Sequence, residues 1–165
     1  MCSSDLTGSN TLVSVGLGGT AGNGGSTEPA ISQDGRFVVF TSLASNLVAS
    51  DTNNASDVFV RDLWTGETSL VSVSAGGVYP GNRASSTPQL SADGRIVLFR
   101  STARDLTASQ RFGPGWYWRD LVAARTVLAP IPVDRGLPAM TPDGRRVGFV
   151  GGLGSGTCSI WDSQK

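Results

Sequence analysis

The 165-residue sequence contains no histidine, a single lysine (Lys165) and only two glutamates, Glu28 and Glu67. Without histidine, the chain cannot itself supply a Ser-His-Asp triad, a Cys-His pair or a histidine-based zinc site. A lysine at the last position is also poorly placed to form a Schiff base or to hold phosphates in a P-loop. We therefore expect neither catalysis nor an organic cofactor in this chain.

Helix-favouring residues and clustered charge are scarce as well. Glycine accounts for 22 residues, and serine and threonine are abundant, which favours strands and turns and hence an all-β fold. The 13 basic and 13 acidic residues are scattered singly and form no basic stripe for nucleic acid. No apolar run approaches the ~20 residues that span a bilayer, so we expect neither nucleic acid nor a membrane span.

The two cysteines are too few for a disulfide framework or a metal site. Cys158 lies in a strand-like stretch, where we expect a small buried hydrophobe and not a nucleophile. Cys2 belongs to residues 1–6, which resemble a translated sequencing adapter and are expected to be a non-native leader; a genuine short leader is the alternative. On the first interpretation, residues 7–165 are a fragment whose true N-terminus is missing.

One pattern occurs three times, at residues 29–40, 88–99 and 138–149. Each copy has Pro, an apolar residue, Ser or Thr, then Asp-Gly-Arg, and ends with Val and Phe at alternate positions. Repeats spaced by roughly 50–60 residues are typical of stacked units such as propeller blades. The sequence therefore predicts an incomplete β-propeller of about three four-stranded antiparallel blades.

The strand pattern places the blade edges near residues 7–15, 28–73, 87–128 and 137–162. Residues 7–15 match residues 65–73 at six of nine positions, which predicts the fourth strand of a preceding blade. In the third unit, Arg146 and Gly148 replace the apolar residues of one face. We expect that face to be poorly packed or to border solvent.

An Asp-Gly pair follows the first strand of each unit, with its aspartate at Asp34, Asp93 or Asp143. Asp-Gly between apolar runs predicts a hairpin with a primed turn and Asp at the first central position. There the carboxylate accepts bonds from nearby backbone N–H groups, joined by the hydroxyl two residues earlier. A residue that recurs in every blade is expected to serve the fold and not a single active site.

Pro29, Ser32, Asp34, Gly35 and Phe40, with their counterparts in the other copies, resemble the WD40-like Pro-Asp repeats of TolB-type β-propellers. The resemblance covers nearly all of residues 7–162. It implies a propeller of roughly six to eight blades, located in the periplasm or outside the cell. It also implies a binding platform, or a non-catalytic domain of a larger protein, with a protein, peptide or glycan ligand.

Asp51, Asn53 and Asp57 are the candidate metal ligands. Oxygen ligands at alternating loop positions suit calcium, which takes six to eight oxygens in flexible geometry. The string lacks the central glycine and bidentate glutamate of a standard calcium loop. The alternative is an Asx-turn loop that only shapes the connection.

Aromatic residues cluster at Trp116, Tyr117 and Trp118. Strand alternation puts the two tryptophans on one face and Tyr117 on the other. We expect them to fill the core between blades; the alternative is an exposed surface that stacks on a sugar or a peptide. The pairs Arg61-Asp62 and Arg119-Asp120 are expected to make cross-strand or turn contacts of small individual effect.

Two functions remain open from the sequence. The first is a non-catalytic binding or scaffold propeller, periplasmic or secreted. The second is the propeller domain of a hydrolase of prolyl-oligopeptidase type, whose catalytic domain lies outside this chain. A downstream Gly-x-Ser-x-Gly followed by Asp and His in the same reading frame would favour the second.

Overall fold

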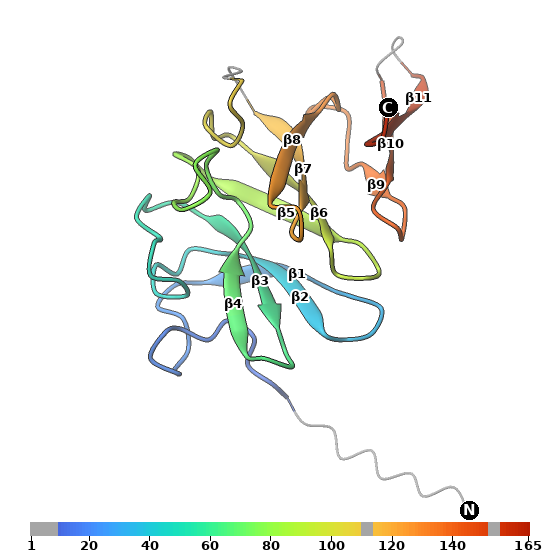
Figure 1. The fold of residues 1–165 in the computed structure, drawn as a ribbon. Coiled ribbons are helices and arrows are strands. Elements are labelled where there is room, and N and C mark those ends of the chain that lie inside the picture. Colours follow the sequence, from blue (N-terminus) through green and yellow to red (C-terminus); the bar gives the residue numbers. More distant parts are fainter. Residues whose placement is uncertain (1–9, 110–113, 152–155) are drawn as a thin grey trace, which may run out of the picture.

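The computed structural model describes residues 10–109, 114–151 and 156–165. These residues form eleven strands in three antiparallel sheets, with no helix among them (Figure 1). Within each sheet the strands follow one another in chain order. The first sheet is β1 (Ser26–Ile31), β2 (Phe37–Ser42), β3 (Asp57–Asp62) and β4 (Glu67–Leu70); the second is β5 (Ser85–Leu90), β6 (Ile96–Ser101), β7 (Gly115–Asp120) and β8 (Arg125–Ala129); the third is β9 (Ala139–Met140), β10 (Arg146–Val150) and β11 (Cys158–Asp162).

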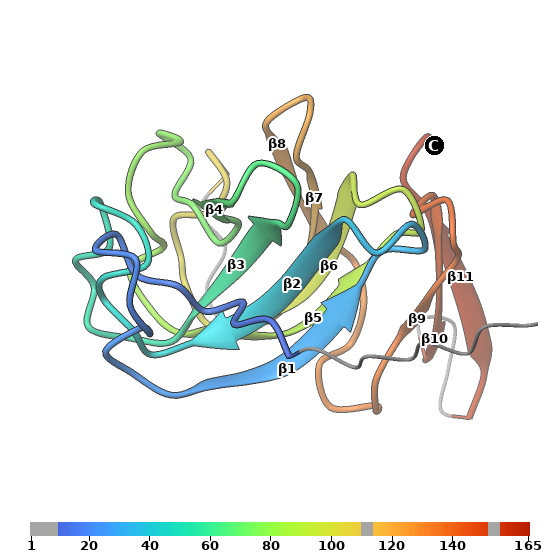
Figure 2. The same ribbon diagram turned by 90° about the horizontal axis from the view of Figure 1, so that it is seen from below.

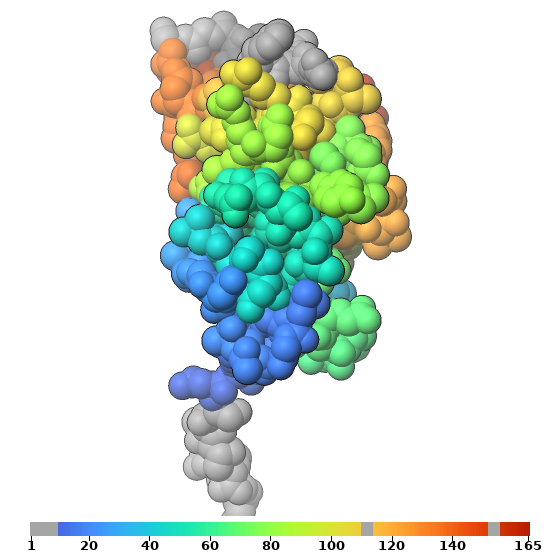
Figure 3. Space-filling view, turned by 90° about the vertical axis from the view of Figure 1, so that its left-hand side faces the viewer, coloured from blue at the N-terminus to red at the C-terminus, as the bar shows by residue number. Residues whose placement is uncertain are grey.

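The sheets stack face to face in sequence order, from the first sheet at one end to the third at the other (Figures 1 and 3). One apolar cluster lies between the first and second sheets and includes Val39, Val60, Val97 and Phe99. A second cluster lies between the second and third sheets and includes Leu98 and the residues Trp116, Trp118 and Val147. This arrangement confirms the predicted all-β fold, an open sector of a β-propeller in which the sheets do not close into a ring.

The central strands are apolar on both faces because both faces are covered. In β6, Val97 and Phe99 face the first sheet, whereas Ile96 and Leu98 face the third. Alternation along a strand sends successive side chains to opposite faces. Burying a side chain of this size contributes roughly 1.5–3 kcal/mol, so the apolar residues of β6 stabilise the stacking of the second sheet on both of its neighbours.

The sheets are also joined at their edges by polar contacts. The backbone N–H of Gln33 donates to the carbonyl of Ala92, and the N–H of Ala92 donates to the carbonyl of Pro142. The Glu28 carboxylate on β1 accepts hydrogen bonds from the Thr87 N–H at 2.7 Å and from the Thr41 hydroxyl at 2.8 Å. Figure 2 shows β1 and β5 side by side at this edge. Successive sheets are therefore held in register by hydrogen bonds as well as by apolar packing.

The segment before the first sheet, residues 7–15, is predicted to be the fourth strand of a preceding blade. Residues 10–14 lie in no strand, and Val15 makes only an isolated bridge with Ala21; residues 7–9 lie outside the described part. Val73 makes an equivalent isolated bridge, with Pro80. The matched segment 65–73 includes β4 (Glu67–Leu70), so the fourth strand of a preceding blade stays a prediction. The leader predicted at residues 1–6 also lies outside the described residues.

The third sheet has three strands, and β9 is only two residues long. Pro138 and Pro142 flank β9, and proline has no N–H to donate to a neighbouring strand. Arg146 is exposed and Ile160 is 72% exposed on the face turned away from the second sheet. The expectation that this face borders solvent is confirmed. No described residue belongs to a helix of the length and hydrophobicity needed to cross a membrane.

Candidate functional site

The Asp-Gly-Arg turns join the first two strands of every sheet. The Ser32 hydroxyl donates to Asp34 Oδ1 at 2.6 Å, and the same oxygen accepts the Arg36 N–H at 3.0 Å. The Gly35 N–H donates to the Ser32 carbonyl, and Gly35 has a φ of 73°. The turn therefore runs from residue 32 to residue 35 with only its glycine at positive φ, so the predicted primed turn is wrong and the predicted polar network is confirmed.

The arginine of each turn forms an ion pair with the last aspartate of the third strand. Arg36 Nη2 lies 2.6 Å from Asp62 Oδ2, and Arg95 Nη2 lies 2.6 Å from Asp120 Oδ2. The hydrogen bonds from Arg36 lower the pKa of Asp62 to about 2. The aspartate also accepts the Trp64 N–H at the following turn. The prediction anticipated turn contacts for these aspartates, but not the arginine of the preceding turn as their partner.

Arg61 and Arg119, which precede these aspartates, make the expected cross-strand contacts. Arg61 Nη1 donates to the Thr68 hydroxyl at 2.9 Å, and Arg119 Nη1 donates to the Thr126 hydroxyl at 2.7 Å. Both partners lie on the adjacent outer strand. The two arginines therefore occupy equivalent positions in the first and second sheets.

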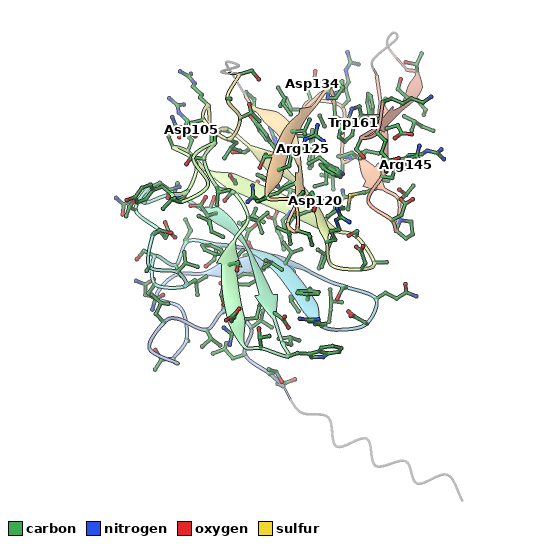
Figure 4. The ribbon with its side chains drawn as sticks, viewed as in Figure 1. Asp105, Asp120, Arg125, Asp134, Arg145 and Trp161 are labelled. Carbon is green, nitrogen blue, oxygen red and sulfur yellow. The ribbon has the colours of Figure 1, made fainter. Side chains whose placement is uncertain are left out.

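A polar groove lies where the second and third sheets meet at the turn end. It encloses about 280 Å³, and Asp120, Arg125 and Arg145 line it from the two sheets (Figure 4). Asp93 and Asp143 also line it. Arg125 is exposed, and its side chain makes no hydrogen bond or ion pair within the described part of the chain. The groove thus offers one uncommitted cation among fixed carboxylates, which suits a polar or mixed-charge ligand.

The predicted calcium loop is built around hydrogen bonds that use the donor atoms of the candidate ligands. Asn53 Nδ2 donates to Asp57 Oδ2 at 2.7 Å and to the Gly81 carbonyl at 2.8 Å, and Asn53 Oδ1 accepts the Ala55 N–H. The Ser72 hydroxyl donates to Asp57 Oδ1 at 2.6 Å. These hydrogen bonds engage both carboxylate oxygens of Asp57 and the side-chain amide of Asn53 within the fold.

Asp57 is fully buried at the start of β3. Burial raises its pKa to about 6, against the opposing effect of the hydrogen bonds from Ser72 and Asn53. The geometry thus supports the alternative of an Asx loop, here one that ties β3 to the segment after β4. Calcium binding itself stays a prediction, and calorimetric titration with millimolar calcium chloride is its test.

The aromatic cluster fills the interfaces between the sheets, as expected. Trp116 and Trp118 are buried against the third sheet, and Tyr117 is buried against the first. Trp118 Nε1 donates to the Gly144 carbonyl at 2.7 Å, and its ring meets the edge of the Trp161 ring at 6.3 Å. The alternative of an exposed stacking surface for a sugar or peptide is wrong at these positions.

Cys158 is exposed, contrary to the predicted buried role. Its register partner is Val150, and it shares the outward face of the third sheet with Ile160. Strand alternation predicts which residues share a face with Cys158, but it does not predict which of the two faces packs against the second sheet.

Two sets of side-chain to backbone hydrogen bonds between loops were not predicted from the sequence. Asn46 Oδ1 accepts the Asn23 N–H, and Asn23 Oδ1 accepts the Ser45 N–H, both at 2.9 Å. Asp105 and Asn82 make the equivalent contacts in the second sheet. The recurrence of Asn before the first strand of the first two units, at Asn23 and Asn82, was the available signal.

No family model and no curated protein matches the sequence. Among solved structures, TolB from Acinetobacter baumannii is similar with a TM-score of 0.50 at 20% identity, over 85% of this chain and 30% of that one. The acylaminoacyl peptidase of Pyrococcus horikoshii is similar with a TM-score of 0.50 at 15% identity, over 78% of this chain and 17% of that one. The chain thus spans less than a third of either structure, and at these identities the likeness concerns the fold. In its fold, the chain is a TolB-like β-propeller module.

Proposed function

We propose that this chain is part of a non-catalytic propeller that binds a protein or peptide ligand in the periplasm or outside the cell. The groove between the second and third sheets carries the proposal, because Arg125 stands there without a partner among ordered carboxylates. A rim position on a propeller leaves such a groove open to an extended ligand. The fold supports a periplasmic or secreted location through its likeness to TolB.

A peptide selection with charge-reversal variants tests the proposal. Displayed random 12-residue peptides would be selected on the protein, and their affinity compared for Arg125→Glu and for Arg83→Glu, an exposed arginine outside the groove. We expect Arg125→Glu to weaken the selected peptides at least about tenfold, close to 1.4 kcal/mol, and Arg83→Glu to leave them unchanged. Failure to select any peptide, or peptides indifferent to Arg125→Glu, would contradict the proposal.

The second candidate is the propeller domain of a hydrolase whose catalytic domain lies outside this sequence. The likeness to an acylaminoacyl peptidase favours it. The genomic reading frame distinguishes the two candidates: a Gly-x-Ser-x-Gly motif followed by Asp and His supports the hydrolase. A frame that holds only further repeats supports the binding propeller.

A further inference from the structure

Arg119 carries a guanidinium group into the interface between the first and second sheets. It is only 9% exposed, and it lies on β7 beside Val97 on β6. Its Nε is buried without a hydrogen-bond partner among the described residues. Burial lowers the pKa of Arg119, against the opposing charge of Asp120. A buried cation without a paired anion is costly to the fold, so this position calls for an explanation.

The carboxylate next to Arg119 in sequence is committed elsewhere. Asp120 accepts hydrogen bonds from Arg95 at 3.0 and 2.6 Å and caps the N–H groups of the following turn. It lines the groove toward the third sheet. Asp120 is therefore the ion-pair partner of Arg95, and no carboxylate among the described residues is in contact with the Arg119 guanidinium.

Two cavities border Arg119, and they differ in charge. The larger one, about 290 Å³, is also lined by Asp62 and Glu67. The smaller one, about 150 Å³, is lined by no carboxylate and includes the hydroxyl residues Ser74, Thr107 and Thr126. A water molecule takes about 30 Å³, so the smaller cavity has room for a group of several non-hydrogen atoms. An anion is electrostatically favoured there and disfavoured in the larger cavity.

The first sheet provides the comparison. Arg61 makes the same contact with Thr68 that Arg119 makes with Thr126. Arg61, however, is only half-buried, and Glu67 lines the cavity beside it. In the third sheet the equivalent position, paired with Val147, is Trp161. Among the described residues, only the second sheet combines a deeply buried arginine with a hydroxyl-lined cavity free of carboxylates.

We propose that Arg119 and the hydroxyl-lined cavity beside it form a binding site for a carboxylate group. The planar guanidinium fork matches a carboxylate and gives paired, charge-assisted hydrogen bonds. The Thr126 hydroxyl accepts a hydrogen bond from Arg119 Nη1 and can donate its own O–H to the carboxylate. The hydroxyls of Ser74 and Thr107 already donate to the carbonyls of Tyr79 and Ser109, so these two residues make the lining polar. The site lies between the first two sheets and is separate from the groove of the proposed function, so either one can fail without the other.

Titration with sodium acetate, followed by NMR of the arginine Nε–H signals, tests the site. We expect a saturable shift of the Arg119 signal with acetate and none with sodium chloride at equal ionic strength. Arg119→Gln should abolish saturable acetate binding, whereas Arg61→Gln, the matched change in the first sheet, should leave it intact. An acetate response no larger than that of chloride, or binding that survives Arg119→Gln, would overturn the proposal.

Two milder variants keep the test decisive should Arg119→Gln fail to fold. Arg119→Lys keeps the charge but loses the planar fork, and it should weaken acetate binding at least about tenfold. Thr126→Val removes one hydroxyl and should weaken binding several-fold; unchanged binding in both folded variants contradicts the site.

The carboxylate could belong to an acidic side chain of a peptide or to a small organic acid, and two probes distinguish these ligands. Binding of both N-acetyl-aspartate methylamide and acetate indicates the peptide side chain, whereas binding of acetate alone indicates the small organic acid.

Discussion

The second and third sheets arise from the same repeat but differ in how they are covered. The second sheet is packed on both faces, through Val97 and Phe99 toward the first sheet and through Leu98 toward the third. The third sheet buries Val147 on one face, while Arg146 and Ile160 of the other face meet solvent. The repeated turn and ion pair occur in both. The repeat therefore determines the strand geometry, whereas the sheets packed against each face determine how deeply a sheet is buried.

The largest effect is expected for the phenylalanine that ends each repeat. Phe99 is fully buried and stacks on Tyr117, whereas Phe149 is half-buried in the third sheet. Phe99→Ala should lower the free energy of unfolding by about 3–5 kcal/mol, and Phe149→Ala by clearly less. Urea denaturation of both variants measures this, and equal losses would break the comparison between the sheets.

The next largest effect on stability is expected at two turn glycines, which form a matched pair. Gly35 and Gly94 have the same φ of 73°, but a Cβ on Gly94 would come within 2.2 Å of the Phe37 ring, whereas nothing lies within 4 Å at Gly35. Alanine costs about 1–2 kcal/mol at either position for its left-handed backbone. Gly94→Ala should cost about 1–3 kcal/mol more through overpacking. Thermal denaturation showing Gly35→Ala to be as harmful would refute the stacking of Phe37 on the second sheet.

Asp57 and Asp162 should respond to pH in opposite directions. Burial raises the pKa of Asp57 to about 6 from 3.8, so its folded form holds a proton more tightly, and its contribution to stability is lost as pH rises from about 4 through 6. Arg145 lowers the pKa of Asp162 to about 2, so its contribution is present above about pH 4 and is lost as pH falls toward 2.

Unfolding free energies between pH 2 and 7 test this difference. Asp57→Asn should remove part of the slope between pH 4 and 6, and Asp162→Asn should remove part of the slope below pH 4. The wild-type slope in each window serves as the control. An Asp57→Asn variant with the wild-type slope between pH 4 and 6 would show that this carboxylate is not buried as described.

The smallest effect is expected at the ion pair of the second sheet. Arg95 is about half exposed, and its partner Asp120 is nearly buried. Because solvent screens an exposed pair, Arg95→Gln should cost about 0.2–1 kcal/mol. The cost should shrink in high salt. Chemical denaturation at low and high sodium chloride measures it, and a cost of several kcal/mol that salt does not reduce would contradict solvent screening of this pair.

The repeat made the fold predictable, because spacing alone places Pro, Asp-Gly-Arg and the alternating apolar residues. The first sheet, from β1 at Ser26 to β4 ending at Leu70, lies close to the predicted blade of residues 28–73. The turn type was not predictable from Asp-Gly, since the Ser32 carbonyl accepts the Gly35 N–H and closes the turn one residue earlier. Local propensity favoured the primed turn, and the longer loop between the strands overrode it.

The sites were less predictable, because they depend on which sheet faces which. The loop of Asp51, Asn53 and Asp57 offers the right atoms for a metal, but Ser72 and Gly81, distant in sequence, engage the donors and acceptors of Asp57 and Asn53. From the sequence, Arg119 is likewise expected to be a charge at a strand end with only minor contacts. In the structure the first sheet covers it. Burial of a polar residue is a property of the stacked sheets, and neighbouring residues in the sequence do not reveal it.

Native-state hydrogen exchange, followed by mass spectrometry, tests most directly that a middle sheet is covered on both faces and that the third is covered on one. The account predicts the slowest exchange in β6 and β7, and faster exchange in β10 and β11, although all four strands are paired in ladders. Equal protection of β6 and β10, or protection confined to one sheet, would contradict the stacked arrangement.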